Sequence, residues 1–283
     1  MANTTANATP KRSEFSIHYR QLINVAFAVF AAILVYFVVN AIIGGKCDGQ
    51  CVIDMLNQTI RYAAPIALAA YCGLMCERAA VINIGIEGMM LMGAMVAYGV
   101  NVYAFTGMKS SGMDAATAGE ISRWIALGLA VVSSGLLALL HGFVSIRFKT
   151  DQIISGTVIN ILALGLTGYF YRQYLAQNIP AGPGTFPLFD IPLLSQIPII
   201  GPIVFSGQKP IVYFMMIITL VIHYVLFYTP WGLRTRAVGE HPRAADTLGI
   251  DVLRIRNITV LVGGLIAGLG GACVSSRVTL STS

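Results

Sequence analysis

The sequence predicts an all-α polytopic membrane protein with about seven transmembrane helices. Hydrophobic residues make up 56% of the 283-residue chain and charged residues only 11%, whereas a soluble domain carries roughly 25% charged residues. The apolar residues fall in long blocks, and about 20 consecutive apolar residues are what a membrane-spanning helix requires. The net charge of +6 does not indicate a nucleic-acid-binding protein, because the Lys and Arg residues sit at the ends of apolar blocks rather than on one basic face.

Seven blocks have the length and composition of spanning helices. They are residues 22–43, 59–76, 80–105, 121–146, 153–175, 211–228 and 258–274. Polar residues weaken the start of the third block, so we expect it to enter the membrane as a broken or re-entrant segment. The seventh block is rich in glycine, and the spacing of Gly264 and Gly268 allows helices to approach closely.

Basic residues near the ends of the blocks favour a cytoplasmic N-terminus. Residues 1–21 are then a cytoplasmic tail, and residues 22–283 form the transmembrane domain. Residues 176–210 become an external connection, whose many prolines predict an ordered cap or short re-entrant pieces rather than a regular helix. Residues 229–256 form a cytoplasmic loop.

The five cysteines do not indicate a metal site. Cys72 and Cys76 lie four residues apart in an apolar block and are expected to be packing residues. Cys47 and Cys51 flank a polar loop, where a disulfide would form in an oxidising compartment, although free thiols are the favoured interpretation. No His or Cys partner lies near with the spacing of zinc ligands.

A polar run lies where the third block begins. It reads Asn83-Ile84-Gly85-Ile86-Glu87-Gly88. An amide and a carboxylate at this depth are costly unless they face protein or water. If the segment is helical, Asn83 and Glu87 share one face beside a substrate pathway; alternatively they are structural, with Glu87 stabilising a broken helix end. Asn160, inside the fifth block, either lines the pathway or bridges two helices.

The cytoplasmic loop contains the pattern of a short helix. Pro242 suits a first helical turn, and Gly249 stands just past the expected end. A short charged helix between two spans is typical of a docking element. Glu240, Arg243 and Asp246 are its candidate partner contacts.

Three stretches, in the same order along the chain, resemble the permease subunits of ATP-driven (ABC) importers for nucleosides and simple sugars, within the wider ribose and branched-chain amino acid permease family. They are residues 77–90, 150–160 and 229–250. In the family's coupling signature, Glu-Ala-Ala is followed by three residues and Gly. Here Arg243-Ala244-Ala245 precedes Gly249 with that spacing, Arg replacing Glu as in the nucleoside and sugar branch. The resemblance covers roughly residues 59–272.

The resemblance implies a multi-pass permease subunit of the bacterial inner membrane that imports nucleosides or simple sugars. One alternative is that the same architecture imports another small polar solute, such as branched-chain amino acids. The other is an inactive shortened form, because family members usually continue past the glycine-rich span. The pathway residues would be Asn83, Glu87 and Asn160. The coupling residues would be Glu240, Arg243, Ala244, Ala245, Asp246 and Gly249.

The resemblance also implies partners. They are an ABC ATPase subunit, a second permease chain (a sister permease or a second copy), an extracytoplasmic substrate-binding protein and membrane lipid. The sequence has no Gly-x-x-x-x-Gly-Lys-Ser/Thr run, which a phosphate-binding ATPase loop requires. We therefore expect no catalytic residue and no bound cofactor, with ATP used by the partner subunit.

Overall fold

The computed structural model describes residues 49–176, 182–192, 194–197 and 200–278. Residues 1–56 and 57–283 form separate units, and the second of these carries the candidate sites. Cys51, in the first unit, is disulfide-bonded, so the expectation of a free thiol at this position is wrong; Cys47 lies outside the described residues. The predicted span 22–43 lies outside them as well.

The described chain is almost entirely helical, which confirms the predicted all-α class. Its α-helices are α2 (Gly49–Glu77), α3 (Ile86–Ser110), α4 (Ala115–Gly142), α5 (Gln152–Phe170), α6 (Pro210–Tyr228), α7 (Pro230–Glu240), α8 (Pro242–Thr247) and α9 (Val252–Val278). π-Helical turns at Phe143–Arg147 and Tyr171–Leu175 extend α4 and α5, and a third, Gly201–Phe205, precedes α6. Within the described residues, six helical segments are long and apolar enough to cross a membrane: α2, α3, α4 and α5 with their π-helical turns, α6 and α9.

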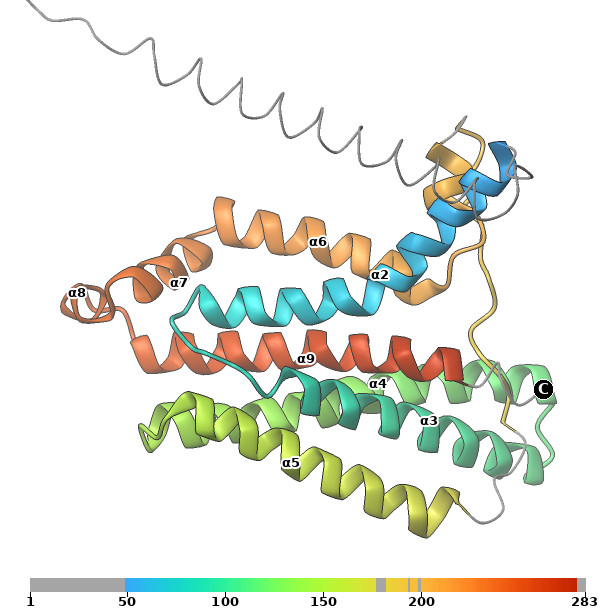
Figure 1. Cartoon of the computed structure of the whole chain (residues 1–283), viewed down its shortest axis with the longest axis horizontal. Helices are drawn as coiled ribbons and strands as arrows, with labels where there is room; N and C mark the ends of the chain where they lie inside the picture. Colours follow the sequence, from blue (N-terminus) through green and yellow to red (C-terminus); the bar gives the residue numbers. More distant parts are fainter. Residues whose placement is uncertain (1–48, 177–181, 193, 198–199, 279–283) are drawn as a thin grey trace, which may run out of the picture. The chain divides into compact units, whose positions relative to one another are not determined.

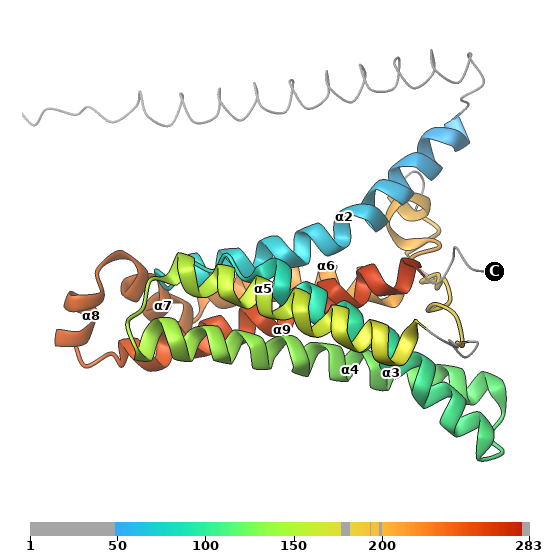
Figure 2. The same cartoon turned by 60° about the horizontal axis from the view of Figure 1, so that its bottom comes forward.

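The centre of the bundle is the contact of α3, α4 and α9, with α5 packed against α3 (Figures 1 and 2). Small residues of α9 make this contact close. A Cβ atom added at Gly268 would lie 2.8 Å from the Cα of Val131 on α4. Ser134 of α4 also donates a hydrogen bond to the carbonyl of Gly264, at 2.8 Å. The predicted close approach through Gly264 and Gly268 is therefore present.

The described part of residues 176–210, the predicted external connection, folds back onto the end of the bundle opposite α8 (Figure 1). The side-chain amide of Asn57 donates to the carbonyls of Pro202 and Ser206, at 3.0 and 2.7 Å. The buried Lys209 donates to the carbonyl of Ser276 in the last turn of α9, at 2.8 Å. The described part of residues 176–210 is thus an ordered cap with one helical turn, one of the forms that its proline content predicted.

Candidate functional site

A break in the helical chain lies between α2 and α3. Residues 78–85 run without regular helix along the bundle, and α3 begins part of the way along it rather than at its end (Figure 1). Ala80 adopts a positive φ of 53°, which is rare for a residue with a side chain. The third predicted span is therefore broken, and its helix begins at Ile86 instead of residue 80. Since Asn83 precedes the helix, it does not share a helical face with Glu87.

Asn83 directs its polar atoms into the break. Its side chain is 8% exposed, and its Oδ1 accepts a hydrogen bond from the backbone N–H of Gly85 at 3.0 Å. Its Nδ2 lies 3.8 and 3.7 Å from the sulfur atoms of Cys72 and Cys76, both of which are buried free thiols. Asn83 thus holds the turn before α3 and connects it to α2.

Asn160 ties α5 to both sides of the break. Its Oδ1 accepts from the backbone N–H of Gly88 at 2.7 Å, and its Nδ2 donates to the carbonyl of Ile84 at 3.1 Å. The N–H of Gly88 belongs to the first turn of α3, where backbone donors have no partner within the helix. Asn160 therefore caps α3 from a neighbouring helix. This is the bridging geometry that the sequence left open beside a pathway role.

Glycines make this bridge sterically feasible. A Cβ atom at Gly88 would lie 2.8 Å from the Oδ1 and 2.9 Å from the Cα of Asn160. A Cβ at Gly156 would lie 2.9 Å from the backbone nitrogen of Gly85. Larger residues at these positions would push α5 away from the break and stretch both hydrogen bonds.

Glu87 differs from the two asparagines because its side chain points away from these contacts. It is exposed, and among the described residues its carboxylate makes no hydrogen bond or ion pair. It lines a crevice of about 410 Å³ between α2, α3 and α9, together with Ala69, Ile86, Met90, Leu91, Ala94 and Val274. Apart from the carboxylate, these lining side chains are apolar.

The break also contacts the elements on either side of the predicted docking helix. Arg256, near the start of α9, donates from Nε to the carbonyl of Ala79 at 3.1 Å. Gly239, near the end of α7, lies against the carbonyl of Arg78. Gln152 accepts from the N–H of Ile82 at 2.6 Å. Sequence reasoning assigned no such role to Gln152 or Arg256; their polar character at the start of apolar helices was the available signal.

The short helix α8, the predicted docking element, has the predicted bounds. Pro242 occupies the first turn of α8, and Gly249 follows it with a φ of 78°. The N–H of Gly249 bonds to the carbonyl of Asp246 at 2.9 Å, and the N–H of Ile250 bonds to that of Ala245 at 3.1 Å. These two bonds form a Schellman motif, in which a left-handed glycine ends the helix.

The six predicted coupling residues divide into two groups. Ala245 is only 2% exposed and packs with Val238 of α7 and Ile255 of α9, so it anchors α8. The other five are exposed: Glu240, Arg243, Ala244, Asp246 and Gly249. Leu248 is 80% exposed beside them, although the sequence did not single it out. Together these exposed residues form a surface at the end of the bundle where α2 ends and α9 begins (Figure 1).

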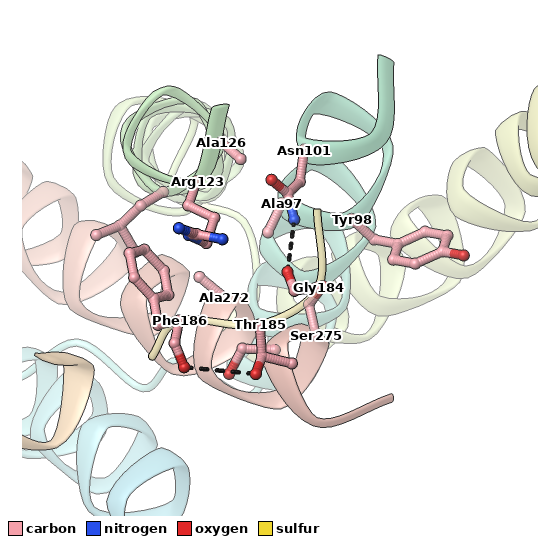
Figure 3. A pocket seen from close by; sticks show the side chains of 12 residues that line it. Ala97, Tyr98, Asn101, Arg123, Ala126, Gly184, Thr185, Phe186, Ala272 and Ser275 are labelled. Atoms are coloured by element: carbon pink, nitrogen blue, oxygen red, sulfur yellow. Dashed lines mark hydrogen bonds between the residues drawn. The ribbon is translucent and has the colours of Figure 1, made fainter. Parts of the chain in front are cut away.

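A small polar pocket lies at the opposite end, where the segment 183–186 crosses α3, α4 and α9 (Figure 3). Asn101 donates to the carbonyl of Gly184 at 3.3 Å, and Arg123 donates to that of Pro183 at 3.2 Å. The pocket measures about 30 Å³, which is room for about two water molecules. The two hydrogen bonds hold the cap segment against α3 and α4. The described residues contain no cluster of side chains suited to a metal ion.

The six apolar spans, one of them preceded by the helix break, are the architecture of a multi-pass membrane protein. Residues 55–283 match the family described as the permease component of the branched-chain amino acid transport system. The chain belongs to this family.

Three relatives specify the resemblance. The guanosine ABC transporter permease protein NupQ of Bacillus subtilis is 39% identical over 78% of this chain and 67% of its own length. The nucleoside ABC transporter permease protein NupC of Lactococcus lactis is 32% identical over 77% of this chain and 66% of its own. The putative glucose ABC transporter permease protein TsgC13 of Haloferax volcanii is 34% identical over 78% and 62%. The chain thus spans about two thirds of the length of these relatives. No solved structure matches it.

Proposed function

We propose that the chain is a permease subunit of an ATP-driven importer of nucleosides. The observation that carries this proposal is its similarity to two permeases named for guanosine and nucleoside transport. That similarity extends over more than three quarters of the chain. The family match, residues 55–283, includes both the helix break and the exposed α8 surface.

The subunit would work with partners that supply what it lacks. A separate ABC ATPase subunit would bind and hydrolyse ATP, and an extracytoplasmic binding protein would deliver the substrate. A second permease chain, either a sister permease or a second copy, would complete the pathway. The positive charges near the α7–α9 end favour the cytoplasmic side for α8. The protein would then lie in the bacterial inner membrane with its N-terminus in the cytoplasm.

The exposed α8 surface would dock to the ATPase. Arg243, Ala244 and Asp246 protrude from a helix held by the buried Ala245. The ATPase must bind two permease conformations with different affinity if ATP is to drive transport. Contacts from the flanks of α8 to residues 78–82 would carry its displacement to the start of α3.

Uptake of radiolabelled guanosine, ribose and leucine tests the proposal in cells that make the whole transporter, with and without this subunit. Loss of guanosine uptake alone is expected. Loss of ribose or leucine uptake instead would show that the subunit transports a different solute, and the proposed importer architecture would stand. A sugar is the second candidate, because the Haloferax relative is named for glucose.

The coupling assignment has its own test. Arg243→Glu is expected to lower transport at least tenfold while the chain still inserts into the membrane, because Arg243 is exposed and no described residue depends on it. ATPase activity that no longer responds to substrate-loaded binding protein would accompany this loss. Normal uptake in this variant would remove Arg243 from the coupling surface.

A further inference from the structure

The position of Glu87 within the bundle is the starting point. Its neighbour Gly88 packs against Asn160, which lies eight residues into α5 (160 − 152). Ala69, across the crevice, lies eight residues before the end of α2 (77 − 69). Eight helical residues correspond to about 12 Å along a helix axis. The carboxylate therefore lies well inside a bundle whose helices span a hydrocarbon layer about 30 Å thick.

The charge of Glu87 argues against lipid as its environment. A charged side chain at this depth faces water or protein rather than hydrocarbon. The exposed residues Leu136 of α4 and Ile161 and Leu164 of α5 carry no charge: they are apolar and 61%, 65% and 66% exposed. These residues suit lipid. The crevice between α2 and α3 is thus the side of the chain that faces an aqueous path.

The chemistry of the crevice selects a kind of solute. Its volume of about 410 Å³ lies in the range of small-molecule pockets, roughly 300–1,000 Å³. Met90, Leu91 and Ala94 give it an apolar wall suited to the face of a planar ring. An ionised carboxylate is a pure acceptor with two oxygens, and two neighbouring hydroxyl groups can donate to both. The same carboxylate offers no hydrogen-bond donor to a carboxylate on a solute.

We propose that the Glu87 crevice is a substrate subsite that recognises the vicinal 2′,3′-hydroxyls of a ribonucleoside, with the base against Met90 and Leu91. This inference rests on the proposed function and adds a specificity-determining residue to it. It also accounts for relatives named for nucleosides and for glucose, because both kinds of solute carry adjacent hydroxyls. An amino acid such as leucine lacks adjacent hydroxyls.

A structural role for Glu87 makes a different prediction. The residue stands in the first turn of α3, where a negative charge stabilises the helix through its dipole. Removing a purely structural charge would lower the uptake of every substrate by the same factor. Removing a diol-binding group would lower only the uptake of substrates that carry the diol.

The experiment compares guanosine with 2′,3′-dideoxyguanosine in cells that make the whole transporter. The variants are Glu87→Gln and Glu87→Asp, with Glu120→Gln as a control at an exposed acidic residue of α4. We expect Glu87→Gln to lower guanosine uptake about tenfold to a hundredfold, the typical effect of losing hydrogen bonds to a charged group, and to leave dideoxyguanosine uptake unchanged. Glu87→Asp should keep part of the preference for guanosine, and Glu120→Gln all of it.

The outcomes separate this inference from the proposed function. No guanosine uptake by the unaltered transporter would contradict the function itself. If the unaltered transporter takes up guanosine normally, two results in Glu87→Gln would overturn the subsite alone. One is an equal loss of guanosine and dideoxyguanosine uptake, and the other is no loss of either.

A second variant keeps the test valid if Glu87→Gln fails to assemble. In Leu91→Cys, which places a thiol in the same crevice and keeps Glu87, a water-soluble thiol reagent should label the introduced thiol, and guanosine should protect it better than dideoxyguanosine. The unaltered chain measures the background from Cys72, Cys76 and Cys273, which are buried. An unlabelled thiol, or equal protection by both compounds, would overturn the subsite.

Discussion

The helix break at residues 78–85 and the helix α8 are both short elements beside glycines, but they satisfy their polar groups in opposite ways. In the break, Asn83 and Asn160 bond to backbone groups within the chain. In α8, only Ala245 is turned inward, and the polar side chains are exposed. The break is therefore positioned by the chain itself, whereas α8 presents a surface that a partner would complete.

The largest expected effect follows from the tight packing of the break. Gly88→Val should lower the free energy of unfolding by about 3 kcal/mol or more, because the side chain would overlap the backbone of α5 and separate Asn160 from its partners. Thermal unfolding of the detergent-solubilised chain measures this loss. Gly165→Val is the matched control, since a Cβ there meets no atom within 4 Å. Similar losses in both variants would show that the break is not tightly packed.

Two adjacent alanines separate anchoring from docking in α8. Ala245→Asp places an unpaired carboxylate among Val238 and Ile255, which should detach α8 at a cost of about 3 kcal/mol and abolish hydrogen-exchange protection of its amides. Ala244→Asp, on the exposed side, should change stability by less than about 0.5 kcal/mol while it lowers transport. If the two variants lost equal protection, the buried position of Ala245 would not anchor the helix.

Asn160 tests the bridge with a smaller change. Asn160→Ala removes both hydrogen bonds and leaves the N–H of Gly88 and the carbonyl of Ile84 without these partners. The cost should be about 2 kcal/mol, the upper range for losing a helix cap. Thr157→Ala, three residues earlier on the exposed face of α5, is the control and should change thermal unfolding little. An equal shift in both variants would argue against the bridge.

The spans and the bounds of α8 could be predicted from the sequence. The length and apolar content of the spans predicted six described helices, since a bilayer leaves few alternatives for a hydrophobic backbone. Pro242 and Gly249 predicted the bounds of α8 because both residues have strong conformational preferences.

The partners of the polar residues could not be predicted in the same way. Asn83, Asn160 and Glu87 all stood out as polar groups in apolar blocks, and each could be read either as a pathway residue or as a structural one. Only the fold shows that Asn160 reaches the break 72 residues away in the chain, while Glu87 faces a crevice. Such contacts depend on how helices cross, which periodicity within one helix does not encode. The roles of Gln152 and Arg256 were missed for the same reason.

The smallest expected effect concerns the residue that ends α8. Gly249 has a φ of 78°, and a Cβ there would meet no atom within 4 Å, so a substitution would be limited by backbone conformation rather than by space. Gly249→Ala should cost about 1 kcal/mol, and Gly249→Asn less, because asparagine tolerates the left-handed region. Hydrogen exchange at Ile250, whose N–H closes the Schellman motif, measures the loss directly. If transport and hydrogen-exchange protection both fall in the order Gly, Asn, Ala, the proposed coupling to the ATPase depends on the backbone conformation at the end of α8. If protection falls and transport does not, the proposed coupling depends on the exposed side chains alone.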